Sequence, residues 1–391
     1  MTNAPKLDED QLGVWETHPE RRPRAGTIDL LCQLYNTHAQ GLGFTGDYRN
    51  TDPPVATTAH SRTKTQQGTA VAGTIERQAA EARKRLDRTL ARGTVTPSQL
   101  DALDERLMCL RHEYLYTAPA PMLNTLLAEL DEVRELAGER QPAAVQKRLS
   151  EMIALLATMV ADALMKLGAL RDSRAWYATA RTSADDSGTT ELRVLVRAQA
   201  AMLPYYYGPL SSAVALAREA RLLSRHRPTP MGVLAAAAEA RALARQGDAG
   251  GAQHAVRIAL ADFERCEHGP ADDAFAFPER RLLLYLSGAY TFLGMTRQAR
   301  DVQQRALRLY PERTGIDPAL LRIEEAIGLA QDHSLTEACQ LATATYLRLP
   351  EEQRTPILGA RAQHIIDVLP PAMRSARAAR ELGEVLALPP A

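Results

Sequence analysis

The chain has 391 residues and a formal net charge of zero, from 47 Lys plus Arg and 47 Asp plus Glu. This balance argues against a protein-wide field that would attract nucleic acid or an anionic membrane, and 45% hydrophobic residues argue against wholesale disorder. Helix-favouring Ala, Leu, Arg and Glu are abundant, aromatic residues make up only 5%, and no run of alternating β-branched residues requires a strand, so we predict an all-α protein.

Residues 1–44 predict a small helical region with a distinctive order of residues. Trp15-Glu16 is followed by Arg21-Arg22-Pro23, by a helix that Thr27 caps, and by the turn Gly41-Leu42-Gly43-Phe44. This order resembles the second half of a lambda-repressor-like (Xre-type) helix-turn-helix domain, in which a Trp-Glu pair ends the recognition helix and an Arg-Pro turn follows. In many actinobacterial members of that family, a linker and tetratricopeptide-like repeats come next, and the order here matches.

The resemblance implies a transcriptional regulator with a partial helix-turn-helix. The first two helices of the family domain have no counterpart, and the positions that would face DNA bases hold Asp8, Glu9, Asp10 and Gln11. Phosphate repels three acids at such positions, where Arg, Lys, Asn or Gln is needed. Either the true start lies upstream or the DNA-binding unit has decayed. We expect DNA to be a weak partner at most, and the remaining candidate contacts are Gln11, Arg21 and Arg22.

Residues 45–70 have the composition of a flexible linker. Within them, Arg49–Thr69 holds Pro53-Pro54, six threonines and one strongly apolar residue, Val55. Such a segment buries too little to offset the entropy of ordering. Residues 71–140 predict a helical connector of three helices. The first covers 71–92. The second starts at the capping box Thr96-Pro97-Ser98-Gln99 and ends before Pro119 and Pro121, and the third follows these prolines.

A phrase of small residues recurs in residues 141–391, which we interpret as one repeat domain. A glycine is followed five residues later by an alanine and seven residues after that by another. From Gly208 to Gly247 is 39 residues and from Gly247 to Gly294 is 47. A spacing of roughly 40 residues indicates stacked helix pairs. The copies are Gly208-Ala213-Ala220, Gly247-Ala252-Ala259, Gly294-Ala299-Ala306, a fourth with His333 and Ala338, and a weaker one at Gly168 and Ala175.

The caps and breakers predict where the paired helices begin and end. Asp317-Pro318 starts one helix, and Ser334 with Glu337 predicts a capping box at another. The Gly-, Pro- and Asp-rich segment 265–278 predicts an insertion on one edge of the stack. The expected pairs are 143–167 with 171–184, 190–206 with 210–225, 231–246 with 249–264, 278–293 with 296–310, and 318–332 with 335–348, followed by helices over 352–368 and 372–387.

The repeated phrase resembles the tetratricopeptide repeat over about residues 160–350. In that family the turn glycine precedes two alanines by five and twelve residues and a proline by seventeen, and Pro311 and Tyr290 fit this pattern around Gly294. The resemblance implies a right-handed α-solenoid whose concave groove, formed by the first helix of each pair, binds a peptide or protein partner. The groove positions projected from each turn are Gln199, Tyr205, Tyr206, Arg241, Arg245, Arg281, Tyr285 and Glu324.

No catalytic or metal-binding motif is present in the sequence. HExxH, GxxxxGK[ST], GxSxG and GxGxxG before a strand are all missing, and Cys266-Glu-His268 has no second pair of ligands nearby. We therefore expect no enzyme activity, cofactor or metal. Two hypotheses remain: a transcriptional regulator whose repeat domain binds a peptide, a small ligand or a protein, with the dimerisation usual in that family, and a protein-interaction scaffold that does not bind DNA.

The sequence also indicates a cytoplasmic protein without a membrane partner. Its four cysteines are far apart and form no CxxC pair, which fits a reducing compartment. The acidic start, MTNAPKLDEDQLG, does not have the basic and then apolar pattern of a signal peptide. The most apolar segment, Met152–Leu170, is interrupted by Asp162 and Lys166 and predicts a buried helix rather than a membrane span.

Overall fold

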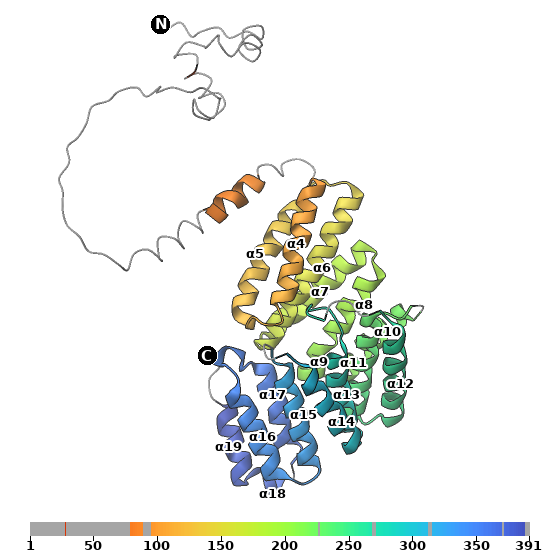
Figure 1. Cartoon of the computed structure of the whole chain (residues 1–391), viewed down its shortest axis with the longest axis vertical. Helices are drawn as coiled ribbons and strands as arrows, with labels where there is room; N and C mark the ends of the chain where they lie inside the picture. The colour runs from red at the N-terminus through yellow and green to blue at the C-terminus, as the bar shows by residue number, and fades with distance from the viewer. Residues whose placement is uncertain are drawn as a thin grey trace, which may run out of the picture. The chain divides into compact units, whose positions relative to one another are not determined.

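The computed structural model describes residues 28, 79–88, 95–225, 227–267, 271–311, 315–369 and 371–387. The chain divides into two units, Met1–Gln78 and Ala79–Ala391. The predicted partial helix-turn-helix, the predicted linker and the candidate DNA contacts Gln11, Arg21 and Arg22 fall in the first unit and lie outside the described residues, which include only residue 28 there. The second unit, drawn as coloured ribbon in Figure 1, takes in both the predicted repeat domain and the described part of the predicted connector.

All regular elements in the described residues are helices, which confirms the predicted all-α class. Residues 79–88 are helical, and the remaining elements follow in chain order from α4 to α19 (Figure 1). They are α4 (Pro97–Glu113), α5 (Pro119–Ala137), α6 (Ala143–Lys166), α7 (Leu170–Ser187), α8 (Thr190–Ala200), α9 (Met202–Tyr207), α10 (Leu210–Ser224), α11 (Pro230–Gln246), α12 (Ala249–Arg265), α13 (Glu279–Phe292), α14 (Thr296–Leu309), α15 (Asp317–Gln331), α16 (Leu335–Arg348), the 3-10 turn η2 (Glu351–Gln353), α17 (Pro356–Asp367), α18 (Pro371–Arg374) and α19 (Arg377–Leu386).

The capping signals of the sequence are only partly confirmed. At α4, the N–H of Gln99 donates to the Thr96 hydroxyl and the N–H of Thr96 donates to the Gln99 side chain at 2.9 Å, so this capping box is present. The predicted box of Ser334 with Glu337 is wrong, because Ser334 precedes α16 without capping it through its side chain. Its backbone ψ is 58°, far from the extended 155° that directs the Thr96 hydroxyl onto its helix.

Proline accounts for two other differences from the predicted helices. The expected helix over 190–206 is divided into α8 and α9, because Pro204 has no N–H to donate to the carbonyl of Ala200. Pro119 was expected to end the preceding helix together with Pro121. Instead α4 already ends at Glu113, and Pro119 occupies the first position of α5, where its fixed φ and missing N–H are tolerated.

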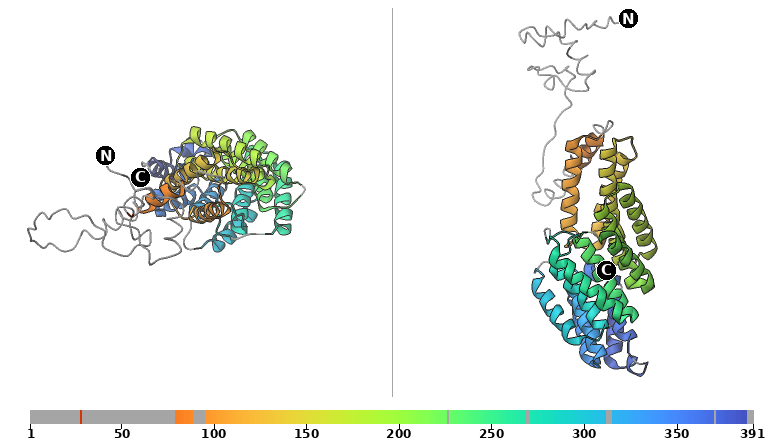
Figure 2. Two further views of the ribbon diagram at one scale, coloured as in Figure 1. Left: turned by 90° about the horizontal axis from the view of Figure 1, so that it is seen from above. Right: turned by 90° about the vertical axis from the view of Figure 1, so that its right-hand side faces the viewer.

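The helices pack in pairs, and the first helices of the pairs also touch one another. Within pairs, α6 packs on α7, α8 on α10, α11 on α12, α13 on α14, and α15 on α16. Between pairs, contacts run in the order α6, α8, α11, α13, α15 and α17, and α17 also reaches α6 and α9. Figure 2 shows the helices of this unit, whose colours pass from orange through yellow and green to blue along the chain. The first helices therefore enclose a common interior.

The repeated phrase of small residues lies where helices cross closely. All seven alanines of the four stronger copies are buried: Ala213, Ala220, Ala252, Ala259, Ala299, Ala306 and Ala338. The weak copy was assigned wrongly, since Ala175 is exposed. The residues five and twelve positions after Gly168 are Ser173 and Ala180, and both are fully buried. Small side chains at these positions let two helix axes approach each other.

The turn position of the phrase requires an unusual backbone in three of the four stronger copies. Gly247 and Gly294 have φ of 89° and 68°, and His333, which replaces the glycine in the fourth copy, has φ of 64°. Gly208 differs, with an extended backbone at φ −140°; a side chain there would come within 3.1 Å of the Cα of Pro204. Gly208 is thus required by close approach, whereas the other two glycines are required by the left-handed turn.

Candidate ligand-binding site

A cleft of about 140 Å³ opens in the interior that the first helices enclose. Its walls come from α6, α8, α9, α11, α13, α15 and α17, together with the end of α4 and the segments before α13 and α15. The lining contains both aromatic rings and charged side chains. The aromatic and polar residues of the lining include Tyr114, Asp162, Lys166, Gln199, Tyr206, Arg241, Asp273, Phe275, Arg280, Arg281, Tyr285, Tyr310 and Asp317.

Residues 271–277, here called the strap, form one wall of this cleft. The Asp273 carboxylate pairs with the Arg111 guanidinium through contacts of 2.5 and 3.1 Å, and the N–H of Ala274 donates to the Arg111 carbonyl at 3.0 Å. Phe275 is buried and lies under the Arg111 guanidinium at 5.5 Å. The segment was predicted as an insertion on an edge, and that prediction is wrong: the strap packs inward and ties α4 to α13.

Arg241 lies at the bottom of the cleft between two aromatic rings. Its guanidinium carbon is 4.0 Å from the ring centre of Tyr205 and 3.9 Å from that of Tyr285, with Tyr206 at 5.6 Å. One Nη contacts the sulfur of Met202, and its Nε–H is buried without a hydrogen-bond partner. Among the described residues, no carboxylate lies within ion-pair distance of Arg241, although only 4% of the residue is exposed.

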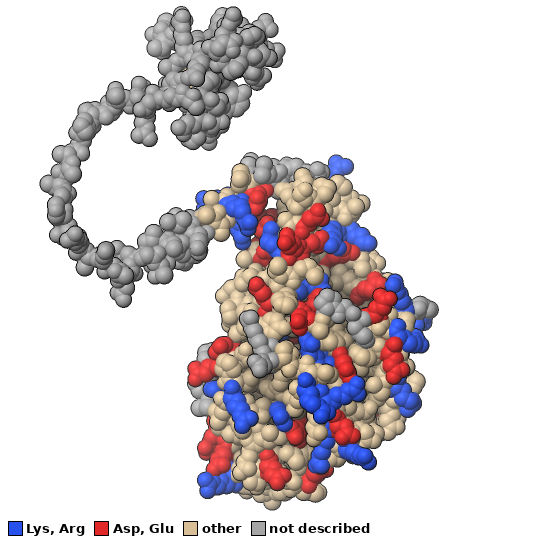
Figure 3. All heavy atoms as spheres, viewed as in Figure 1, with Lys and Arg blue, Asp and Glu red and all other residues tan. Residues whose placement is uncertain are grey.

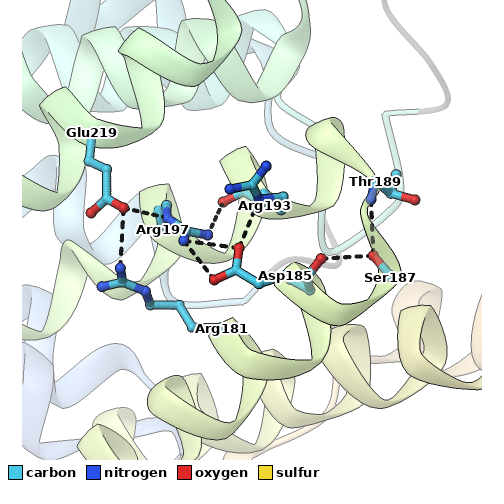
Figure 4. A network of polar contacts seen from close by, with 8 residues as sticks. Arg181, Asp185, Ser187, Thr189, Arg193, Arg197 and Glu219 are labelled. Carbon is cyan, nitrogen blue, oxygen red and sulfur yellow. Dashed lines mark hydrogen bonds and ion pairs between the residues drawn. The ribbon is translucent and has the colours of Figure 1, made fainter. Parts of the chain in front are cut away.

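The other two arginines that are buried in the described residues are both paired with carboxylates. Arg197, also 4% exposed, binds both oxygens of Asp185 at 2.9 and 3.0 Å and Glu219 at 2.7 Å, as Figure 4 shows. Arg361 donates to both oxygens of Glu324 at 2.7 and 2.6 Å. Burial of an unpaired charge costs several kcal/mol, so Arg241 is the exception that requires an explanation.

Seven of the eight groove residues predicted from the sequence lie in or next to this cleft. Five of them line it: Gln199, Tyr206, Arg241, Arg281 and Tyr285. Tyr205 lies behind Arg241, and Arg245 donates to the Tyr205 carbonyl at 2.6 Å. Glu324 does not reach the cleft, because Arg361 holds its carboxylate in the core. The neighbouring Tyr207 lines a separate groove.

Several residues of the site were not found by sequence reasoning. Arg361 follows Glu324 by 37 residues and lies beyond the last copy from which groove positions were projected. Tyr114 and Lys166 both contact Asp162, at 2.5 and 2.7 Å, but they belong to helices that precede the recognised copies. Phe275 lies in the strap, and no local signal in the sequence places that segment against α4.

The surroundings of Arg241 are electropositive. Arg245 and Arg361 lie within 6.0 Å of the Tyr205 ring centre, and Glu324 is already paired. Burial, together with the charges of Arg361 and Arg245, lowers the pKa of His364 to about 4, so this imidazole is neutral at pH 7. Its Nε2 is buried without a hydrogen-bond partner. Because two arginines already make this region positively charged, a nearby histidine stays neutral and adds no further charge.

The surface charge, the absence of a metal-binding cluster and the character of the helices, all in the described residues, limit the kinds of binding site to be considered. Figure 3 shows Lys and Arg interspersed with Asp and Glu over the face drawn, without a continuous basic area among the described side chains there. No group of three or more His, Cys, Asp or Glu residues in the described parts could hold a metal ion. None of the helices described combines the length and the apolar character needed to cross a bilayer.

Comparisons with known proteins add no identification. No protein-family model matches the sequence, and a search of curated proteins gives no significant match. The arrangement of side chains in the cleft is therefore the basis for a functional conclusion.

Proposed function

We propose that the chain is a regulator in which a tetratricopeptide-like solenoid binds a small ligand or the end of a peptide in the central cleft. Occupancy of the cleft controls the association of the first unit with DNA. The single observation that supports this proposal is the convergence of residues projected from one repeat spacing onto one cleft. Five such residues, from four helices, line it. Convergent polar groups in a concave, partly apolar site are the usual features of a ligand pocket.

The size of the cleft favours a compact ligand over a partner helix. An α-helix with its side chains is about 10–12 Å across, and a cleft of about 140 Å³ cannot hold one. The contacts of α17 with α6 and α9 close the interior further, so an extended peptide could not pass along the whole set of first helices. A small molecule or one terminal residue of a peptide has a suitable size.

A gel-shift experiment tests the regulatory part of this proposal. The full chain is incubated at low salt with a randomised DNA pool, with and without a small-molecule fraction from cell extract. We expect retarded DNA whose amount changes when the fraction is added. The Arg21→Glu/Arg22→Glu variant should lose retardation, since both residues are candidate phosphate contacts. A complete lack of retardation by the wild-type chain at low salt would remove DNA regulation from the account.

A protein-interaction scaffold is the second candidate, and a specific groove favours it. This groove, of about 420 Å³, lies between α7, α9 and α10 and is lined by apolar side chains that include Leu203, Tyr207 and Leu216. The acids at positions 8–10 agree with a protein that does not bind DNA. A pull-down with wild-type chain and with the Leu216→Glu variant tests this candidate. Equal recovery of partners by both proteins would argue against the groove as the binding surface.

A further inference from the structure

Arg241 combines deep burial, an open donor and a position on the cleft. Its Nε–H has no partner, one of its Nη groups contacts the Met202 sulfur, a weak acceptor, and its side chain is also hydrogen-bonded to Tyr206. The tyrosine rings contribute cation–π attraction to this desolvated guanidinium. That attraction does not supply the hydrogen-bond acceptors that a guanidinium needs. A carboxylate would supply them, because it can accept from Nε–H and an adjacent Nη–H together.

Carboxylates do not compensate all of the positive charges that line the cleft, so an additional anion can be accommodated there. Lys166 is neutralised by Asp162 at 2.7 Å, and Arg280 lies 3.3 Å from the Asp272 carboxylate. Arg281 donates to the carbonyls of Ala274 and Ala276, which are neutral acceptors. Asp273 is held by Arg111, and Asp317 accepts from the Tyr310 hydroxyl at 3.2 Å. Among these described residues, Arg241 and Arg281 therefore have no carboxylate within ion-pair distance.

The size and lining of the cleft define the rest of the ligand. Its volume of about 140 Å³ is close to that of an apolar cavity, roughly 150 Å³, that accepts benzene. Tyr114, Tyr206, Phe275, Tyr285 and Tyr310 contribute rings to the lining. These surfaces suit an apolar body about the size of one ring. A highly hydrated phosphate ester fits this lining less well than a carboxylate does, because most of its surface is polar.

We propose that the cleft binds the carboxylate of a ring-sized organic acid on Arg241, whether a free acid or the C-terminal residue of a peptide. This inference rests on the proposed function, because it names the ligand class of the same cleft. In the complex, the carboxylate accepts hydrogen bonds from the Arg241 guanidinium, and the apolar body lies between the strap and α13. The two tyrosine rings restrict the orientation of the guanidinium, so that its N–H donors are positioned before the ligand binds.

Isothermal titration of the full chain with matched acids and amides tests the proposal. Benzoate is compared with benzamide, and N-acetylphenylalanine with its amide, so that the second pair represents a peptide end. We expect one of the acids to bind at least tenfold more tightly than its amide, because a charge-assisted hydrogen bond is worth about 1.5–3 kcal/mol and 1.4 kcal/mol is tenfold. The pair that shows the preference identifies the source of the carboxylate.

Two variants assign the effect to Arg241. Arg241→Met should weaken binding of the preferred acid by roughly 10- to 100-fold and leave binding of the amide unchanged. Arg257→Met, on the exposed face of α12, is the matched control and should retain wild-type affinity. Circular dichroism confirms that both variants are folded. If Arg241→Met does not fold, the preference for acid over amide in the wild type still decides the question.

The outcomes separate this inference from the proposed function. Equal affinity of the wild type for acids and amides, unchanged affinity in Arg241→Met, or no binding of any of the four probes overturns the carboxylate assignment. The gel-shift response to a small-molecule fraction does not depend on these probes. It can therefore succeed when the carboxylate assignment fails, and it can fail when the carboxylate assignment succeeds.

Discussion

The guanidinium carbon of Arg241 lies 3.9 Å from the ring centre of Tyr285 and 4.0 Å from that of Tyr205. Cation–π attraction of about 2 kcal/mol only partly offsets the several kcal/mol that burial of a charge costs. We therefore expect Arg241 to weaken the fold of the free protein. Such a conflict between stability and residue choice is typical of binding sites.

Replacement of Arg241 should stabilise the free protein. We expect Arg241→Met to raise the free energy of unfolding by about 1 kcal/mol or more, because a buried charge without an anion is replaced by an apolar side chain of similar length. Urea unfolding at pH 7, followed by circular dichroism, measures the change. Arg257→Met, at an exposed position, should stay within about 0.5 kcal/mol of wild type. A loss of more than about 2 kcal/mol in Arg241→Met would show that its ring contacts outweigh its desolvation.

Replacement of Arg361 should have the opposite effect. Only 2% of Arg361 is exposed, and both oxygens of Glu324 accept hydrogen bonds from it. Arg361→Met leaves a buried carboxylate without its partner, so we expect a loss of about 3–5 kcal/mol. The double variant Glu324→Leu/Arg361→Met removes both charges and should regain most of this loss. Similar stability of the single and double variants in urea would contradict the pairing argument.

His364 should make the fold less stable in mild acid. Its pKa is about 4 in the folded protein and about 6.5 in the unfolded chain. Between these pH values the unfolded chain binds a proton that the folded chain does not, so stability falls as pH drops from about 6.5 to about 4. We expect this group to contribute about 2 kcal/mol to the loss, after allowance for partial exposure. Stability measured at pH 7 and pH 5 should change less in His364→Gln, whereas the exposed control His254→Gln should behave like wild type.

The turn positions provide a test of backbone strain. His333 has φ of 64° and Gly247 has φ of 89°. An L-residue in the left-handed region is strained by about 1–2 kcal/mol, so His333→Gly should stabilise the protein by about 0.5–1 kcal/mol after the gain in unfolded-state entropy. Gly247→Ala should destabilise it by about 1 kcal/mol, although no atom lies within 4 Å of the added methyl group. Thermal unfolding of the two variants should therefore shift in opposite directions.

The spacing of small residues made much of the helical arrangement predictable. A close helix crossing needs alanine, and a left-handed turn favours glycine, so Gly247 and Gly294 located two junctions correctly. The same spacing brought Gln199 and Tyr285 to one cleft, because each lies nine residues before its turn glycine and so occupies an equivalent position in the first helix of its pair. Local chemistry also predicted the capping box at Thr96.

Features that depend on distant contacts could not be predicted in this way. Asp273 is held by Arg111, 162 residues earlier, and nothing in the strap sequence identifies that partner. The return of α17 to α6 and α9 depends on the sum of small rotations between pairs, which a repeat length does not determine. The sequence also does not distinguish Arg361, which has a carboxylate, from Arg241, which has none, because the partner comes from another helix.

A crystal structure of the full chain soaked with 4-bromobenzoate tests the central claim most directly, because anomalous scattering from bromine locates the ligand and its orientation. The account predicts bromine density in the cleft, with the ring near Phe275 and Tyr285 and the carboxylate within hydrogen-bond distance of the Arg241 guanidinium. A cleft without bromine density at saturating ligand, or a carboxylate that points away from Arg241 towards solvent, would contradict it.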